Sequence, residues 1–370
     1  MNANVKNHLV NIFGSQINNE RAINPAKTYP WWIALIMIII GAFIPVIPIM
    51  VTQGNSKGSA VVNGSTYGFD QHVATLVNKI DNENKYLFYT ENNKLLAKKD
   101  GVEYKDTWID AENSDNIPDA TPIDTYVETY YRNDTAYKRI ALEVYYTDRV
   151  YSSKATEYTV YNMLKGLTKQ TYVVDTNEPV KYTGQDEYKD SAKYTPSFVL
   201  LTKDGLFTYI YKTGTTNVGT YTSNGLDWAN YKTENLMDDL ATVKDVETNP
   251  LDANYVAGVL KNCKVLFDKC FTNQKIRNFW MMSGLFYGIH LVLVVFMGFM
   301  LWLLTRGKNN PNRGLKVYTC FWIAGWICIA PAILAMILGF IFTMAQQIAF
   351  IALIGLRTMW LAMRQLNPKY

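Results

Sequence analysis

Apolar residues are concentrated near the two ends of the chain, and a polar, tyrosine-rich region separates them. Residues 31–51 contain no charged side chain, and a helix of about 20 apolar residues crosses a hydrocarbon core of roughly 30 Å. Similar runs at 279–304, 317–342 and 348–366 predict three more spanning helices, the last of which contains Arg357. The pattern therefore predicts four membrane spans.

The region between the first two spans predicts an α+β domain over residues 52–275. Residues 70–80 have helical periodicity behind an Asp cap, and 251–271 and 226–246 also read as helices. Strand-like runs are found at 85–90, 125–131, 137–146 and 171–174. A hairpin is predicted for 197–203 and 206–212, around the turn Lys203-Asp204-Gly205. The short pieces predict a sheet assembled from distant segments.

The acidic residues indicate the orientation. Of 32 Asp and Glu residues, 31 lie between Asp70 and Asp268, and the other is Glu20. The loop 305–316 has four Lys or Arg residues and no acid, and the segments 1–30 and 367–370 also carry bases. By the positive-inside bias these three segments are cytoplasmic. The sequence thus predicts a multi-pass plasma-membrane protein with both termini inside and residues 52–275 extracytoplasmic, inserted between helices 1 and 2.

An apolar stripe near the N-terminus predicts an interfacial helix on the inner leaflet; it is formed by Val5, Leu9, Ile12 and Phe13.

Polar groups within the predicted spans are candidates for a functional or structural role because they are costly in lipid. Arg357 lies near the middle of the fourth span, where it either snorkels to the inner face or holds carbonyls or a lipid headgroup. We expect a structural role that locks this span to the others, with His290 as a hydrogen-bonding partner.

Small residues and proline in the spans suggest how the helices pack. Gly284 and Gly288 have the small-xxx-small spacing of close helix contacts, loosely continued by Gly298. Such a stripe packs within the bundle or between copies, and we expect the former. Pro331 predicts a bend in the third span.

Four cysteines occur, and Cys320 and Cys328 lie in the third span as predicted core thiols. Cys263 and Cys270 lie on the outer side, where oxidation can occur. In a helix their spacing separates them by about 10 Å, which is too far for a disulfide. Either the segment is not helical and the thiols pair, or both stay reduced. Of these two alternatives, we expect the disulfide between Cys263 and Cys270.

No motif for a known catalytic chemistry occurs in the sequence, which contains no Gly-rich phosphate loop, His-Glu-x-x-His, Gly-x-Ser-x-Gly or Cys-x-x-Cys. His8, His72 and His290 are predicted on three different sides and cannot form one metal site. An acidic cluster that lacks the EF-hand spacing favours a solvated loop over a calcium site; it comprises Asp110, Glu112, Asp115 and Asp119. We therefore predict a non-enzymatic protein without metal or cofactor.

Net charge and tyrosine content limit the classes of partner that we expect this chain to bind. The net charge of +4 is explained by the cytoplasmic flanks and anionic lipid, and it needs no nucleic acid. The region 52–275 holds 22 of the 26 tyrosines. They either form an aromatic platform for sugar or peptide or, as we favour, serve as ordinary strand residues.

Three segments carry a family resemblance: Tyr172-Val-Val-Asp-Thr176, Phe198-Val-Leu-Leu-Thr-Lys-Asp-Gly-Leu206 and the bend at Ile329-Ala-Pro331. With the layout of the spans, they make the chain similar to the bacterial integral-membrane maltodextrin-utilisation proteins. The resemblance implies an accessory role in oligosaccharide uptake beside an ABC-type sugar transporter or other membrane proteins. From the residues alone, we expect an outward domain that binds or senses a ligand or partner; a transport subunit and an envelope scaffold are the alternatives.

Overall fold

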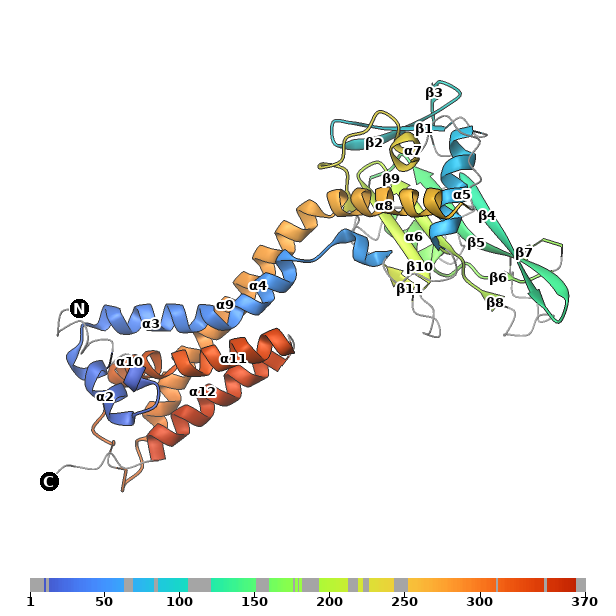
Figure 1. The fold of residues 1–370 in the computed structure, drawn as a ribbon. Coiled ribbons are helices and arrows are strands. Elements are labelled where there is room, and N and C mark those ends of the chain that lie inside the picture. Colours follow the sequence, from blue (N-terminus) through green and yellow to red (C-terminus); the bar gives the residue numbers. More distant parts are fainter. Residues whose placement is uncertain are drawn as a thin grey trace. The chain divides into compact units, whose positions relative to one another are not determined.

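A computed structural model describes residues 10, 13–62, 69–82, 86–105, 121–150, 160–175, 177–178, 180–181, 193–211, 219–221, 226–242, 252–310, 312–342 and 345–363. The chain divides into two compact units (Figure 1). We call Met1–Asn55 with Ile276–Tyr370 the helical unit, and Ser56–Lys275 the sheet unit.

The helical unit begins with α2 (Asn19–Thr28), followed by α3 (Trp31–Phe43), the 3-10 turn η1 (Ile44–Val46) and α4 (Ile47–Gly54). Its later helices are α9 (Thr272–Leu304), α10 (Val317–Ile327), α11 (Ile329–Ile341) and α12 (Ala345–Met363). Of the predicted interfacial stripe only Phe13 is described, and its side chain is 70% exposed; Val5, Leu9 and Ile12 lie outside the described residues.

Three helical stretches among the described residues are long and apolar enough to cross a membrane: Trp31–Gly54, Thr272–Leu304 and Ala345–Met363. A fourth exists if α10 and α11, which meet at an angle of 41°, count as one broken span. Much of their apolar surface faces outward, for example at Leu285, Val292 and Phe340. Exposed apolar side chains of this kind suit a lipid environment, so the helical unit has the character of a membrane-inserted bundle.

Prolines mark both irregular points in these helices. Pro45 lies within the 3-10 turn between α3 and α4, Pro48 follows that turn, and Pro331 follows the break between α10 and α11. A proline cannot donate to the carbonyl four residues earlier, and its ring crowds that carbonyl, so the helix kinks or changes type. The predicted bend at Pro331 is confirmed.

The sheet unit contains helices α5 (Phe69–Asn82), α6 (Val160–Leu167), α7 (Leu236–Leu240) and α8 (Ala253–Cys270) and the turn η2 (Gly58–Val61). Its main sheet has the order β11-β10-β9-β5-β4, and β12 also pairs with β10. These strands are β4 (Asp124–Arg132), β5 (Thr135–Thr147), β9 (Ser197–Thr202), β10 (Gly205–Tyr211), β11 (Gly219–Tyr221) and β12 (Leu226–Asp227). Two small sheets are ordered β1-β2-β3 and β7-β6-β8.

The strands of the small sheets are β1 (Tyr86–Glu91), β2 (Lys94–Lys99), β3 (Val102–Glu103), β6 (Tyr172–Val173), β7 (Val180–Lys181) and β8 (Lys193–Tyr194). In the main sheet, β5 and β9 run parallel, and the long connection between them includes α6. A parallel pair needs such a crossover, whereas the antiparallel hairpins close by short turns.

The main sheet is covered on both faces because its strands alternate between two cores. On β5, Leu142, Val144 and Tyr146 belong to the larger core, which includes residues of α5, α7 and α8. Tyr145 belongs to the other core, which it shares with Phe198 and with α6 residues. The central strands therefore read as nearly continuous apolar runs in the sequence.

The predicted hairpin of 197–203 and 206–212 is confirmed as β9 and β10. The predicted helix over 226–246 is wrong over its described part. There the chain forms β12, a loop and only the short helix α7, while 243–246 lie outside the described residues. The strand β2 and the helix α6 were not predicted.

Candidate functional site

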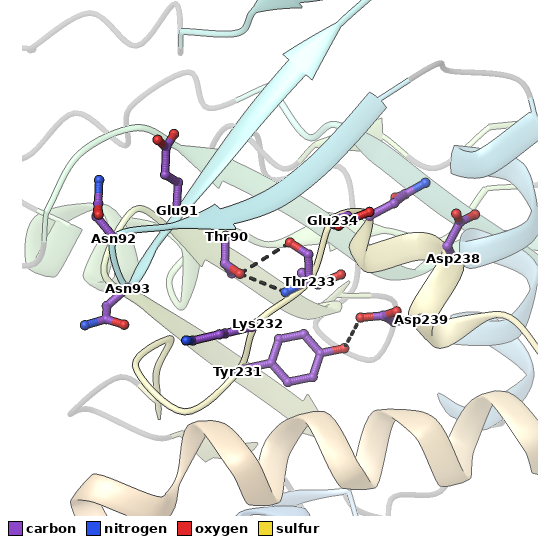
Figure 2. Close-up of a pocket in the computed structure, with 11 residues that line it drawn as sticks. Thr90, Glu91, Asn92, Asn93, Tyr231, Lys232, Thr233, Glu234, Asp238 and Asp239 are labelled. Atoms are coloured by element: carbon purple, nitrogen blue, oxygen red, sulfur yellow. Dashed lines mark hydrogen bonds between the residues drawn. The ribbon is translucent and has the colours of Figure 1, made fainter.

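A polar cleft of about 830 Å³ lies in the sheet unit (Figure 2). One wall is the end of β1 with its turn, and the other is the loop that leads into α7. The lining residues are Thr90, Glu91, Asn92, Asn93, Tyr231, Lys232, Thr233, Glu234, Asn235, Asp238 and Asp239. A cleft of this volume is in the range of small-molecule sites.

The turn in the first wall is a two-residue hairpin loop. Glu91 pairs with Lys94, and the two intervening residues have left-handed backbone angles, φ 51° at Asn92 and 62° at Asn93. Asn tolerates this conformation better than most residues, and paired positive φ values are characteristic of a type I′ hairpin. The turn therefore presents two amide side chains in a fixed place beside the cleft.

Hydrogen bonds between Thr90 and Thr233 join the two walls (Figure 2). The Thr90 amide donates to the Thr233 carbonyl at 2.9 Å, and the Thr90 hydroxyl accepts from the Thr233 amide at 2.8 Å. The second wall is held by Asn235, whose side chain caps α7 by accepting from the Met237 amide at 3.1 Å. These hydrogen bonds hold both walls of the cleft in place, so the cleft is part of the ordered fold.

Tyr231 and Asp239 form a further contact at the cleft. The Tyr231 hydroxyl donates to the Asp239 carboxylate at 3.0 Å. Burial, and then the neighbouring carboxylate charge, raise the pKa of Tyr231 well above its ordinary value. The phenol therefore remains a protonated donor, and it fixes one acidic group at the edge of the site.

Sequence reasoning missed this cleft. One wall lies in the stretch 226–246, which was predicted to be a helix. The signal that points to the other wall is Asn92-Asn93 between two strand-like runs, since two turn-forming residues at that spacing predict a hairpin. The acidic cluster that was considered for calcium, from Asp110 to Asp119, lies outside the described residues.

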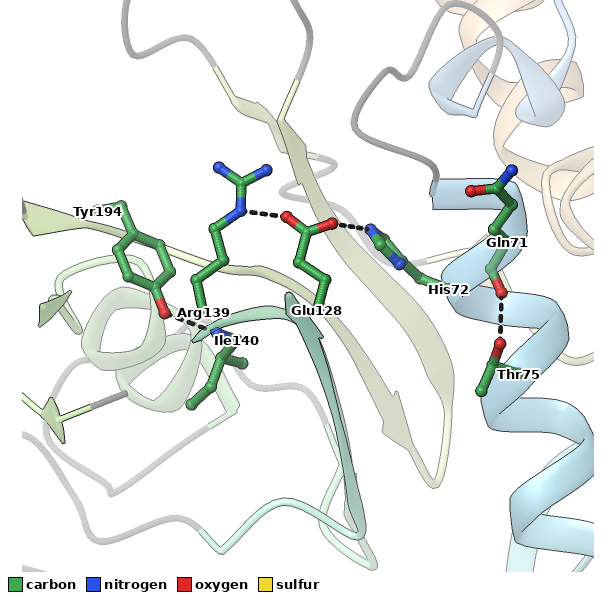
Figure 3. Close-up of polar contacts among 7 residues, drawn as sticks. All are labelled: Gln71, His72, Thr75, Glu128, Arg139, Ile140 and Tyr194. Atoms are coloured by element: carbon green, nitrogen blue, oxygen red, sulfur yellow. Dashed lines mark hydrogen bonds and ion pairs between the residues drawn. The ribbon is translucent and has the colours of Figure 1, made fainter. Parts of the chain in front are cut away.

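A second polar cluster joins α5 to β4 (Figure 3). The Glu128 carboxylate pairs with the Arg139 guanidinium and lies 3.4 Å from Nε2 of His72. His72 is 5% exposed, and its ring packs against the Tyr126 ring at an interplanar angle of 40°, with centroids 4.5 Å apart. The Arg139 guanidinium neutralises the partly buried charge of Glu128, and the contact between Glu128 and His72 ties the helix α5 to the edge strand β4.

A third cluster surrounds a buried carboxylate on β5. Glu143 accepts a hydrogen bond from Tyr145 at 2.9 Å and one from Tyr172 at 2.8 Å. Burial, and then the Glu143 charge, raise the pKa of both tyrosines above their ordinary value, so they remain donors. Many tyrosines thus serve the core, as the strand interpretation expects; Tyr131, 76% exposed, is an exception.

In the helical unit, Arg357 on α12 is 8% exposed and held by neutral oxygens. Its guanidinium donates to the carbonyls of Ser15 and Gln16, both at 3.2 Å, and to the Asn19 side-chain oxygen. It also lies over the Trp360 ring, 4.6 Å from the centroid. Of the alternatives for Arg357, the structure shows the one in which it holds carbonyls.

Gln16 bridges the break between α10 and α11. Its amide nitrogen donates to the Trp326 carbonyl at 2.7 Å, and its oxygen accepts from the Ala330 amide at 2.9 Å. In an unbroken helix, the Ala330 amide would donate to the Trp326 carbonyl directly. The inserted side chain therefore satisfies both groups that the break separates, as buried backbone groups in lipid require.

His290 lies on α9 and contacts the break in the first span instead of Arg357. Its Nδ1 is 3.3 Å from the Ala42 carbonyl, and Gln346 donates to the Pro45 carbonyl one turn later. The expected pairing of His290 with Arg357 is thus replaced by a contact with a proline-kinked backbone. Among the described residues, Nε2 of His290 and Oε1 of Gln346 have no hydrogen-bond partner.

The glycine prediction is wrong for contacts within the chain. A Cβ atom at Gly284 or Gly288 would meet no atom of the described residues within 4 Å, because they leave this face of α9 open. Gly298 is the close contact, since a Cβ there would lie 2.5 Å from Phe321. Pro331 is buried in α11 and accounts for the bend.

The disulfide expectation is also corrected. Cys263 and Cys270 are both free and buried on α8, so the helical spacing keeps the two thiols apart. Burial raises the pKa of Cys263 to about 12 and also raises that of Cys270. Both thiols therefore resist ionisation and oxidation.

No group of His, Cys, Asp or Glu among the described residues is arranged to hold a metal ion. Comparisons of the chain with protein-family models, with curated proteins and with solved structures find no match.

Proposed function

We propose that this chain is a non-enzymatic plasma-membrane protein whose outward-facing sheet unit binds a small polar ligand in the cleft of Figure 2. In this proposal four spans cross the membrane, with α10 and α11 as one broken span. Both termini are cytoplasmic, and residues 52–275 are extracytoplasmic. The distribution of bases supports this orientation, because the loop 305–316 has four Lys or Arg and no acid.

The observation that carries the binding role is the cleft itself. Its lining offers amide, carboxylate and hydroxyl groups from two braced walls, and its volume is about 830 Å³. Amides and carboxylates are the groups that pair with the hydroxyls of a saccharide, since each can accept two hydrogen bonds. The resemblance to maltodextrin-utilisation proteins supports the same ligand class. We therefore propose an accessory role in oligosaccharide uptake, beside an ABC-type transporter.

The test is calorimetric titration of the full chain in lipid nanodiscs with maltotriose. The matched variants are Asn92→Gly and Asn133→Gly, because both residues begin a two-residue turn with nearly equal φ, 51° and 50°. Glycine keeps each turn and removes one amide. We expect Asn92→Gly to weaken binding roughly 3- to 10-fold, the equivalent of one hydrogen bond. Asn133→Gly, outside the cleft, should leave it unchanged.

A transport subunit is the second candidate, and the broken helices favour it. Interrupted spans whose freed backbone groups meet polar side chains occur where transporters bind their solutes. Here the breaks meet Gln16 in one case and His290 with Gln346 in the other. Uptake of labelled maltotriose by proteoliposomes of the chain alone would support transport. Binding without uptake would support the accessory role, and the absence of both would contradict both candidates.

A further inference from the structure

The cleft of the sheet unit has a charge opposite to that of the whole chain. Four carboxylates line it, at Glu91, Glu234, Asp238 and Asp239, together with one ammonium group at Lys232, so the formal charge of the lining is −3. The complete chain has a formal charge of +4. A concave surface with one sign of charge concentrates ligands of the other sign.

Two of these carboxylates are not used by the fold. Glu91 and Glu234 are exposed, and the carboxylate of neither forms a hydrogen bond or ion pair with another described residue. Asp239 differs, since it accepts from the Tyr231 hydroxyl. The two glutamates come from opposite walls, Glu91 from the end of β1 and Glu234 from the loop before α7 (Figure 2). Both remain able to receive a donor from a ligand.

Thr233 supplies an independent sign that a polar group is missing. Thr233 lines the cleft and is only 8% exposed, yet its hydroxyl has no hydrogen-bond partner among the described residues. A buried polar group left unpaired costs about 1–3 kcal/mol, so such groups are rare without a reason. A ligand that hydrogen-bonds to this hydroxyl would remove the cost.

The carboxylates do not converge as metal ligands, because no metal-holding group exists among the described residues. The cleft volume of about 830 Å³ also suits an organic molecule rather than a single ion. We infer that the ligand is a cationic saccharide, which combines hydroxyl groups with primary ammonium groups. This inference rests on the proposed function. The hydroxyls pair with the amides of the Asn92-Asn93 turn, and the ammonium groups pair with Glu91 and Glu234.

The test uses two probes that share a backbone and differ in charge, the glucosamine trimer and its fully N-acetylated form. Both are titrated at pH 6 and low salt into the full chain in neutral-lipid nanodiscs, with maltotriose as a third ligand. We expect the amine-bearing trimer to bind at least tenfold more tightly than the acetylated one, with an affinity that falls as salt is added.

The double variant Glu91→Gln/Glu234→Gln should remove most of this preference, and the control Glu103→Gln on β3 should retain it. Glu103 is also exposed but lies outside the cleft lining. Loss of preference only in the double variant would establish the inference. Equal binding of the two trimers, or binding of maltotriose alone, would overturn the charge selectivity and leave the ligand-binding function intact. No binding of any of the three would overturn both.

Discussion

Arg357 shows how a single charge is accommodated within a bundle of apolar helices. Among the described residues, its acceptors are two backbone carbonyls and one amide oxygen, all from residues 15–19. These neutral dipoles stabilise the charge, and the aromatic face of Trp360 adds a favourable contact with the cation. The residue thus connects the segment before the first span with α12, whereas the sequence predicts a lock between the fourth span and the other spans.

Substitution of Arg357 tests this role. Arg357→Leu removes the hydrogen bonds that the guanidinium donates to the carbonyls of Ser15 and Gln16, and a hydrogen bond to a charged group contributes about 1.5–3 kcal/mol. We expect a clear fall in the thermal unfolding temperature of the full chain in detergent. Arg357→Lys retains the charge but lacks the planar fork of donors, so it should give an intermediate loss. Unchanged stability of Arg357→Leu would refute the locking role.

Between elements, close helix contacts depend on where a small residue faces rather than on its spacing. Gly284 and Gly288 have the expected spacing but face open space, whereas Gly298 packs against Phe321 of α10. The positions of neighbouring helices decide which face of α9 is covered. Periodicity along a single helix therefore identifies candidate contacts without selecting among them.

The two glycines form a matched pair for experiment. In Gly298→Ala the new methyl would lie 2.9 Å from the Phe321 Cα and 2.5 Å from its ring, and overpacking costs typically about 1–3 kcal/mol. In Gly284→Ala the methyl meets no atom in the described part of the chain, and the helix gains about 0.5–1 kcal/mol of intrinsic stability. We expect the unfolding temperature in detergent to fall for the first variant only. Destabilisation by Gly284→Ala would instead indicate packing between copies of the chain.

The predictability of the elements follows from how much of their stability is local. The helix at 70–80 and the hairpin around residue 204 have strong local signals and are found in the structure. The stretch 226–246 has apolar residues at helical spacing, but Leu226 pairs with Leu206 and the Trp228 indole donates to the Thr202 carbonyl at 2.9 Å. Such distant partners override local propensity. The cleft is unpredictable for the same reason, because its walls meet only in the fold.

At the level of the whole molecule, the proposed function requires the sheet unit to be extracytoplasmic. Single cysteines introduced at exposed positions on either side of the proposed membrane test this orientation. Val102 in β3 is 70% exposed, and Lys308 is exposed in the loop after α9. We expect a membrane-impermeant maleimide to label Val102→Cys on intact cells, and Lys308→Cys only after permeabilisation.

The parent chain is a suitable background for this experiment because its four cysteines are all buried. Maleimides react with the thiolate, and burial raises the pKa of Cys263 to about 12, so only a very small fraction of this thiol is ionised at neutral pH. Labelling of Lys308→Cys on intact cells, with Val102→Cys protected, would mean that the orientation is inverted. The cleft would then face the cytoplasm, and an extracellular saccharide would no longer be its ligand. Labelling of both positions on intact cells would place an even number of crossings between them, as a re-entrant hairpin in α9 would.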